Sequence, residues 1–230
     1  IGVVVILGST MDGSYEPVAE VSAALDSLAA APGGPDVPIH VDGASGGFVA
    51  PFLQPELEWD FRIPRVASIN TSGHKYGLVY PGVGWILWRD SDALPEELIL
   101  KVNYLGGEMP TFALNFSRPG AQVVAQYYNF VRLGHAGYRY VMESMKYNAR
   151  RLATRIEAIG AFELVGPHEE QLPLVAFKLK GEHSFDEFDV AAQLAAERGW
   201  MVPAYTLPPN AEHVKIMRIL VKETLGHTLT

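Results

Sequence analysis

A lysine and an aspartate, each following a short apolar segment, are the residues of this chain best suited to chemistry. Lys75 closes the tetrapeptide SGHK (72–75), and Asp42 lies at the end of an apolar run, just before Gly43. A lysine amine can hold an aldehyde as a Schiff base, and a carboxylate can keep a pyridine nitrogen protonated so that the ring withdraws electrons. The pair predicts a site for pyridoxal 5′-phosphate (PLP). The alternative for Lys75 is an ordinary surface lysine.

The neighbours of Asp42 strengthen this interpretation. His40, Asp42 and Ala44 are spaced i, i+2, i+4, so on a strand they share one face. A buried carboxylate is costly without a partner, and a pyridinium N–H is such a partner. Ala44 would then place a small methyl group against the flat ring. The alternative is that Asp42 ends its strand and caps a turn at Gly43, with His40 satisfied in the core.

The composition indicates a folded chain and excludes several classes of function. The 230 residues are 48% hydrophobic and 19% charged, which is enough to form a core. The net charge of −8 argues against a nucleic-acid partner, which would need a basic face. No cysteine is present, which fits a reducing compartment, and we expect a cytoplasmic protein. No apolar run approaches membrane-spanning length, so no membrane partner is expected.

The elements that must position these residues follow from the hydrophobic pattern. Apolar segments at 3–8, 37–41, 66–70 and 84–89 predict strands, and 18–30 has the spacing of an amphipathic helix. Strand, helix and strand in this order indicate a doubly wound α/β layer with a mainly parallel sheet. Such sheets bind ligands at the carboxyl ends of their strands. Thr10, Asp42 and the loop 72–75 all follow such ends.

The second half of the chain predicts a smaller α+β domain. A helix is expected from about 122 to 133, with a break near Gly134 and a continuation to about 160. Strands at 162–165, 172–179 and 214–221 then alternate with a helix at 186–198. We divide the chain into 1–144, the C-terminal part of a large cofactor-binding domain, and 145–230, a small C-terminal domain. Because the chain begins inside a strand and no helix closes it, we expect both domains to be incomplete.

Five segments carry a resemblance to a known family. The runs HVDGASGGF (40–48), WDFR (59–62) and SGHKYG (72–77) resemble the group II PLP-dependent decarboxylases, and YLGG (104–107) and NFSRP (115–119) resemble the members that act on glutamate. The similarity covers essentially all of this chain and corresponds to the middle and C-terminal parts of a longer one. It implies a PLP-dependent transferase-like fold of type I. It also implies decarboxylation of L-glutamate to 4-aminobutanoate by a homodimer or higher homo-oligomer.

The resemblance also implies a role for each matching residue. Lys75 would bind the cofactor aldehyde, and Asp42 would hold the ring nitrogen. The other cofactor contacts would be Ala44 against the ring, Thr10 near its edge, Ser72 and His74 near the phosphate, and Ser117 at the phosphate of the neighbouring subunit. Arg218 would meet the substrate α-carboxylate, unless it is an exposed strand arginine. The proton donor is left open among Lys75, His74 and Tyr104.

Three alternatives remain at this point. The nearest alternative is another group II decarboxylase or lyase. The residues that select the substrate would lie largely in the N-terminal half of the family's sequence, which this chain does not contain. A metal-dependent hydrolase could use His40, Asp42 and His74, although no accompanying motif supports it and no metal is expected. A non-catalytic oligomerisation module is the third. Because the N-terminal half of the family is absent from these 230 residues, we expect the chain by itself to be inactive.

Overall fold

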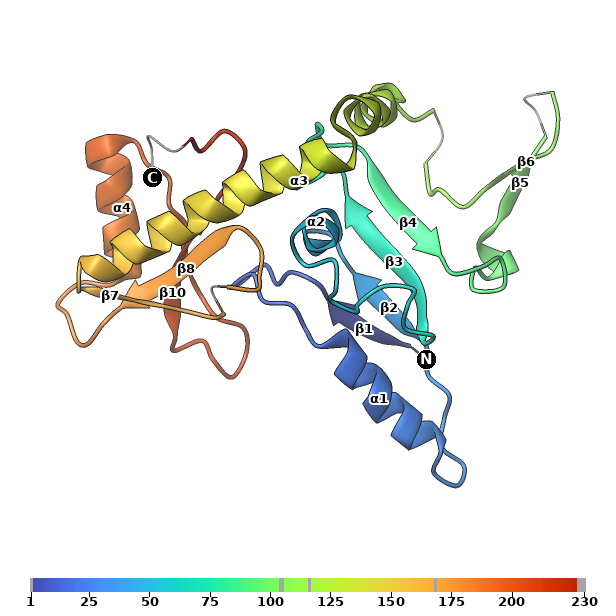
Figure 1. Ribbon diagram of the computed structural model, residues 1–230, viewed down its shortest axis with the longest axis horizontal. Helices are drawn as coiled ribbons and strands as arrows, with labels where there is room; N and C mark the ends of the chain where they lie inside the picture. The colour runs from blue at the N-terminus through green and yellow to red at the C-terminus, as the bar shows by residue number, and fades with distance from the viewer. Residues whose placement is uncertain (1, 104–105, 116, 168, 227–230) are drawn as a thin grey trace.

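The computed structural model describes residues 2–103, 106–115, 117–167 and 169–226 (Figure 1). The helices are α1 (Val18–Ala29), α2 (Ala50–Leu53), α3 (Ala121–Ala158) and α4 (Glu187–Arg198), with short 3-10 turns η1 (Gly46–Phe48) and η2 (Glu96–Leu98). The strands are β1 (Val3–Ile6), β2 (Ile39–Asp42), β3 (Val66–Ser72), β4 (Gly84–Trp88), β5 (Leu100–Val102), β6 (Met109–Thr111), β7 (Phe162–Leu164), β8 (Leu174–Leu179), β9 (Ala204–Thr206) and β10 (Lys215–Leu220).

The first sheet has the strand order β1-β2-β3-β4. Strands β1, β2 and β3 run parallel, which confirms the mainly parallel prediction, and β4 pairs with β3 in the antiparallel direction. Residues 73–83 join β3 to β4 and are too few for a crossover helix, so the chain turns back beside β3. The strand order does not reverse in the described part of this sheet. The described strands therefore do not include the point at which a doubly wound sheet reverses its strand order.

One face of this sheet packs on α1. The helix begins at Val18 directly after Pro17 and presents Val18, Val21 and Leu25 to the sheet. In the strands, Val5 and Val41 are 2% and 0% exposed. This burial fixes which face of each strand points inward, because a slip of one residue would turn every apolar side chain outward.

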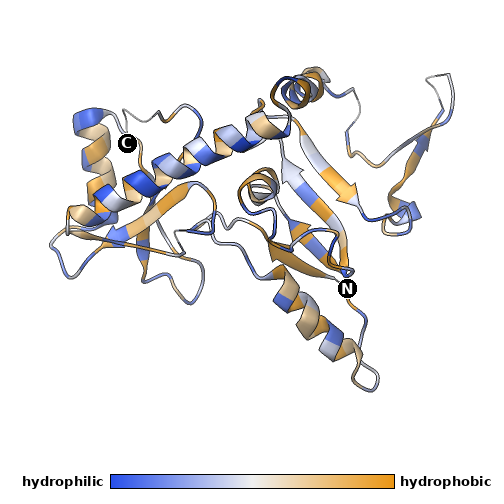
Figure 2. Ribbon diagram, in the orientation of Figure 1, coloured by the Kyte–Doolittle hydropathy of each residue, from blue (hydrophilic) through white to orange (hydrophobic). Residues whose placement is uncertain are grey.

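The second sheet is antiparallel, with the order β7-β8-β10-β9, and α3 packs across it. The predicted break in the long helix is confirmed at Gly134, whose φ of 58° and ψ of −170° are not helical. The core beneath α3 contains Met142, Met145 and Phe177, and it extends to Tyr76 beside the first sheet. Figure 2 shows apolar residues concentrated on the strands and polar residues recurring along α3.

Several elements differ from the sequence expectation. Strands β5, β6 and β9 were not predicted, and each has only three residues, too few for an alternating pattern to stand out. Helix α4 matches its prediction and begins at a capping box, in which the Asp186 carboxylate accepts N–H bonds from Phe188 and Asp189. No helix in the described ranges is long and apolar enough to cross a membrane.

Candidate active site

The carboxyl ends of the three parallel strands meet at one edge of the first sheet. The Leu7 N–H donates to the carbonyl of Asp42 (2.9 Å), and the Gly46 N–H donates to the carbonyl of Leu7 (2.9 Å). The Ser72 N–H donates to the carbonyl of Ala44 (3.2 Å). The loops after β1, β2 and β3 are therefore in contact, as the sequence predicted.

Asp42 is half-buried, and one of its two carboxylate oxygens, Oδ1, accepts two hydrogen bonds. Asp42 Oδ1 accepts the Ala44 N–H (3.0 Å), so the turn-capping role considered from the sequence is real. The same oxygen accepts the side-chain amide of Asn70 (3.0 Å). Among the described residues no hydrogen bond is made to Oδ2, which leaves that oxygen free to accept a bond from a ligand.

His40 lies behind Asp42 in a hydrogen-bonded row. Its Nδ1 lies 2.7 Å from Ser68 Oγ, and its Nε2 lies 2.7 Å from Asn70 Oδ1. Both ring nitrogens are therefore engaged, which supports a satisfied structural histidine. The described part of the chain has no group of three or more His, Asp or Glu side chains that could hold a metal ion. The described residues therefore give no support to the metal-dependent hydrolase alternative.

The turn that carries Lys75 is anchored on α3. Lys75 is half-buried and His74 is exposed, whereas Gly77 is buried. The Gly77 carbonyl accepts two hydrogen bonds from α3, one from Gln126 Nε2 (2.8 Å) and one from the Tyr138 hydroxyl (2.9 Å). Burial raises the pKa of Tyr138 to about 12, so its hydroxyl keeps the proton that it donates.

The segment after β10 reaches the same turn from the other side. Lys222 Nζ donates to the Lys75 carbonyl and lies 5.2 Å from the ring centroid of Tyr76. Burial raises the pKa of the Tyr76 hydroxyl and lowers the pKa of Lys222. The lysine turn is therefore held between α3 and the C-terminal segment.

Arg218 of β10 contacts the loop after β1. Its Nη1 donates to the Thr10 carbonyl, and its guanidinium carbon lies 5.6 Å from the ring centroid of Tyr205. The Tyr205 hydroxyl in turn donates to the Met11 carbonyl (2.7 Å). Arg218 Nε is buried and has no hydrogen-bond partner in the described part of the chain. Thr10 and Arg218, two residues to which the family resemblance gave roles, thus lie together.

Ser117 does not join this group. It is exposed, has a φ of 51°, and forms no hydrogen bond with the other nominated residues in the ranges described. Helix α3 begins at Ala121 with Gly120 at its N-cap, so Ser117 does not cap this helix. Tyr104, one candidate proton donor, lies outside the described residues.

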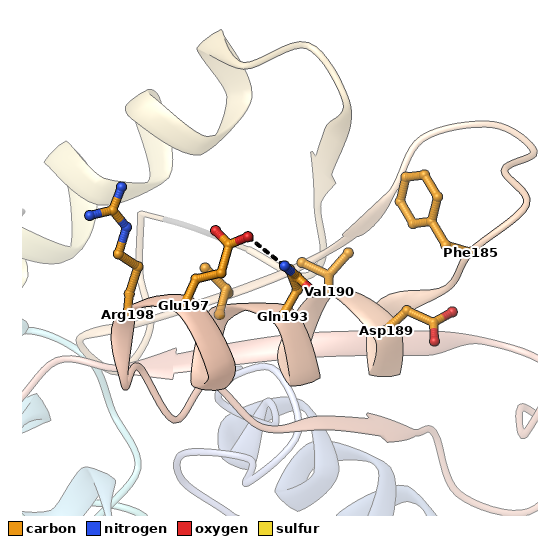
Figure 3. Close-up of a pocket in the computed structure, with 7 residues that line it drawn as sticks. Phe185, Asp189, Val190, Gln193, Glu197 and Arg198 are labelled. Carbon is orange, nitrogen blue, oxygen red and sulfur yellow. Dashed lines mark hydrogen bonds between the residues drawn. The ribbon is translucent and has the colours of Figure 1, made fainter.

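A cavity adjoins the site on the side of β10. Its volume is about 630 Å³, and Arg218 and Lys222 supply cationic groups to a lining that is otherwise mainly apolar, including Trp200, Met201 and Val202. A second pocket lies over α4 (Figure 3) and includes Phe185 and the hydrogen-bonded pair Gln193 and Glu197. None of the residues nominated from the sequence lines the pocket over α4, whereas Arg218 lines the 630 Å³ cavity, which connects that cavity with the site.

Sequence reasoning missed residues that complete this arrangement. Asn70 could have been found, because Ser68 and Asn70 alternate on β3 as His40 and Asp42 do on β2. Parallel pairing of these strands sets the two rows side by side. Lys222 had no comparable signal, because nothing near it in the chain indicates that it reaches Lys75.

Comparison with known proteins gives a consistent result. A family model described as the pyridoxal-dependent decarboxylase conserved domain matches residues 1–180. A glutamate decarboxylase of Petunia hybrida is 51% identical over 227 residues, covering 99% of this chain and 45% of the relative. A glutamate decarboxylase of Aliivibrio fischeri is 53% identical over 224 residues, covering 96% of this chain and 48% of the relative. The chain therefore spans somewhat less than half the length of these relatives.

Solved structures agree on the fold. The glutamate decarboxylase of Lactobacillus brevis superposes with a TM-score of 0.93 at 46% identity, over 99% of this chain and 52% of that one. A tryptophan decarboxylase of Catharanthus roseus superposes with a TM-score of 0.76 at 18% identity, over 97% of this chain and 47% of that one. The second similarity concerns the fold alone. The type I fold expected from the sequence is confirmed.

Proposed function

The chain belongs to the pyridoxal-dependent decarboxylase family, and on that premise we propose that the full-length protein decarboxylates L-glutamate to 4-aminobutanoate and CO2. In this reaction the bond between Cα and its carboxylate breaks, CO2 leaves, and a proton takes its place at Cα. The observation that carries the proposal is the contact, at one sheet edge, of the loops that hold Thr10, Asp42 and Lys75, together with the bond from Arg218 to the Thr10 carbonyl. The identity of about half of the residues to glutamate decarboxylases of a plant and a bacterium supports the choice of substrate.

The residues at the sheet edge fit PLP. Asp42 offers Oδ2 to the ring N–H because its Oδ1 is already engaged. Lys75 offers the amine that binds the aldehyde, and Ala44 offers a small side chain beside the ring. Ser72 and His74 offer hydrogen-bond donors to the phosphate. When bound, the cofactor supplies a protonated ring that withdraws electrons from the carbon that loses CO2.

Arg218 would hold the substrate by its α-carboxylate. A guanidinium binds carboxylates through two parallel N–H bonds. The contact of Nη1 with the Thr10 carbonyl fixes the plane of the group, and the buried Nε is without a partner among the described residues. Lys75 and the adjacent His74 are the described candidates for the proton donor to Cα.

The assembly and location of the protein form a separate part of the proposal. We propose a homodimer or higher homo-oligomer in which Ser117 serves the phosphate of the partner's site. The exposure of Ser117 supports this role, because the side chain is accessible to a partner. Exposed apolar side chains of α3, among them Val124, Tyr127 and Val131, offer a surface for the contact. The lack of cysteine supports a cytoplasmic location. We place the domain boundary at 144, within α3 and after its kink.

The proposed function is tested on the full-length protein by measuring CO2 release from a panel of amino acids. We expect glutamate to be the preferred substrate. Reduction with borohydride followed by peptide mass analysis should place the cofactor on Lys75. Lys75→Ala should lose this adduct and reduce turnover by orders of magnitude, since the covalent link is gone.

Lys180→Ala is the matched control, because Lys180 is exposed and is not part of the site. It should keep both the adduct and the activity. An adduct that persists in Lys75→Ala would refute the assignment of the lysine. Preference for an aromatic amino acid would instead support another decarboxylase of the same group.

A further inference from the structure

We propose that Asn70 is a positioning residue for the cofactor site, acting through a directional row of hydrogen bonds that runs from Ser68 through His40 and Asn70 to Asp42. The inference rests on the proposed function, because it assigns Asp42 to the ring nitrogen of PLP. It adds a residue that no sequence motif nominated. The row joins two strands whose paired residues are 28 positions apart in the chain.

The sheet register creates the row. His40 pairs with Ser68, and Asp42 pairs with Asn70, in adjacent parallel strands. The four side chains therefore form two neighbouring cross-strand pairs. On the other side of β3, the residue of β4 opposite Asn70 is Ile86. His40 and Asp42 are accordingly the titratable groups that face Asn70 from the strands paired with β3.

The chemistry of the groups fixes the direction of each bond. Asp42 Oδ1 lies 3.0 Å from the Asn70 nitrogen Nδ2 and can only accept when ionised, so Nδ2 is the donor. The carbonyl oxygen Oδ1 of Asn70 then faces His40 Nε2 at 2.7 Å, so that ring nitrogen must carry a proton. In the neutral ring the other nitrogen, Nδ1, accepts from the Ser68 hydroxyl at 2.7 Å. Rotating the Asn70 amide by half a turn would place its oxygen against Asp42 Oδ1 and its NH2 group against the protonated Nε2 of His40, so Asp42 and His40 together hold the amide in this orientation.

The hydrogen bond from Asn70 to Asp42 determines which carboxylate oxygen of Asp42 can bind the cofactor. Asn70 and the Ala44 N–H both donate to Oδ1, at 3.0 Å each. Two donors on one oxygen fix the plane of the carboxylate. That arrangement presents Oδ2 to a ligand, and loss of the Asn70 bond would leave the Ala44 N–H to hold the carboxylate less firmly. A site group whose own rotamer is locked by neighbouring hydrogen bonds binds its partner more tightly.

The test compares variants of the full-length protein by two measurements made without substrate. One is the dissociation constant of PLP for the apoprotein, and the other is the absorption spectrum of bound PLP as a function of pH. Asn70→Ala should weaken PLP by roughly tenfold, the value of one hydrogen bond to a charged group, and should alter the spectrum. Asn148→Ala is the matched control. Asn148 is buried whereas Asn70 is half-buried, and the Asn148 amide likewise donates one hydrogen bond, to the Leu225 carbonyl (2.9 Å), but among the described residues it makes none with Asp42.

Asn70→Asp keeps the shape of the side chain and separates positioning from folding. At neutral pH its new carboxyl group lies beside Asp42, and two carboxylates so close resist joint ionisation. PLP affinity should therefore fall at neutral pH and recover as the pH is lowered, because the protonated group can donate to Asp42 in place of the amide. Asn70→Ala should show no such recovery. If Asn70→Ala does not fold, this pH dependence carries the test.

The outcomes are distinct. Failure of the unmodified full-length protein to bind PLP would overturn the proposed function itself. Normal PLP binding in the unmodified protein, with Asn70→Ala no weaker than Asn148→Ala, would overturn the positioning role alone. A pH-independent affinity in Asn70→Asp would also overturn it.

Discussion

The buried carbonyl of Gly77 should make Gln126 and Tyr138 energetically coupled. Both side chains donate to this oxygen, Gln126 Nε2 at 2.8 Å and the Tyr138 hydroxyl at 2.9 Å. Gln126 is 0% exposed and Tyr138 is 2% exposed, so water cannot easily replace either donor. Gln126 Nε2 also lies 3.0 Å from the Tyr138 oxygen. The carbonyl therefore keeps one donor when the other is removed.

The expected magnitudes follow from this arrangement. Tyr138→Phe leaves Gln126 on the carbonyl but removes two hydrogen bonds, so it should lower the free energy of unfolding by about 2 kcal/mol, at about 1 kcal/mol for each bond. Gln126→Met should cost a similar ~2 kcal/mol, because it also removes two bonds while Tyr138 still holds the carbonyl, and the lost Oε1 had no partner in the described structure. The double variant loses all three bonds and leaves a buried acceptor bare, which adds a desolvation penalty of about 2 kcal/mol. We therefore expect a total loss of about 5 kcal/mol.

A double-mutant cycle measured by urea unfolding of the full-length protein tests this reasoning. The coupling energy between the two sites should be about 1 kcal/mol, because the bond between Gln126 and Tyr138 is already lost in each single variant. Tyr138→Phe combined with Asn148→Ala is the control, because Asn148 bonds to the Leu225 carbonyl and shares no partner with Tyr138. That pair should be additive. A coupling below roughly 0.5 kcal/mol between Gln126 and Tyr138, the usual scatter for independent sites, would refute the shared-acceptor argument.

Two further predictions concern Gly73 and Lys146. A Cβ atom at Gly73 would lie 2.6 Å from Gln126 Oε1 and 2.6 Å from a methyl carbon of Val83. Gly73→Ala should therefore lower the free energy of unfolding by about 1–3 kcal/mol through overpacking, as measured by thermal melting. It should also speed the release of PLP, as measured by cofactor dissociation. Lys146 is buried and donates to the Gln171 carbonyl (3.0 Å), and burial, aided by the charge of Arg150, lowers its pKa from 10.5 to about 8. The unfolded chain keeps this proton up to about pH 10.5, so the free energy of unfolding should rise from pH 8 to pH 10.5, and urea titrations of Lys146→Met should lack that rise.

The sequence by itself determined the elements whose signals are local. The apolar runs of β1, β2 and β3, the stripe of α1 and the break at Gly134 depend on residues close together in the chain, and the structure confirms them. It also determined that Thr10, Asp42 and the loop before Lys75 follow strand ends. Once the strands are parallel, their carboxyl ends must meet at one edge.

The tertiary structure alone decided which distant residues complete the site. Asn70 reaches Asp42 because of the register between two strands, and a shift of one residue would turn it to the other face. Arg218 meets the loop of Thr10 across 208 positions, and Lys222 meets Lys75 across 147 positions, because β10 is added to the second sheet and the core beneath α3 extends to Tyr76 beside the first sheet. Local patterns report burial and turns, whereas contacts over such separations depend on how whole elements pack. Lys222 therefore carries no local signal, and the signals at Asn70 and Arg218 do not by themselves say which residues these two contact.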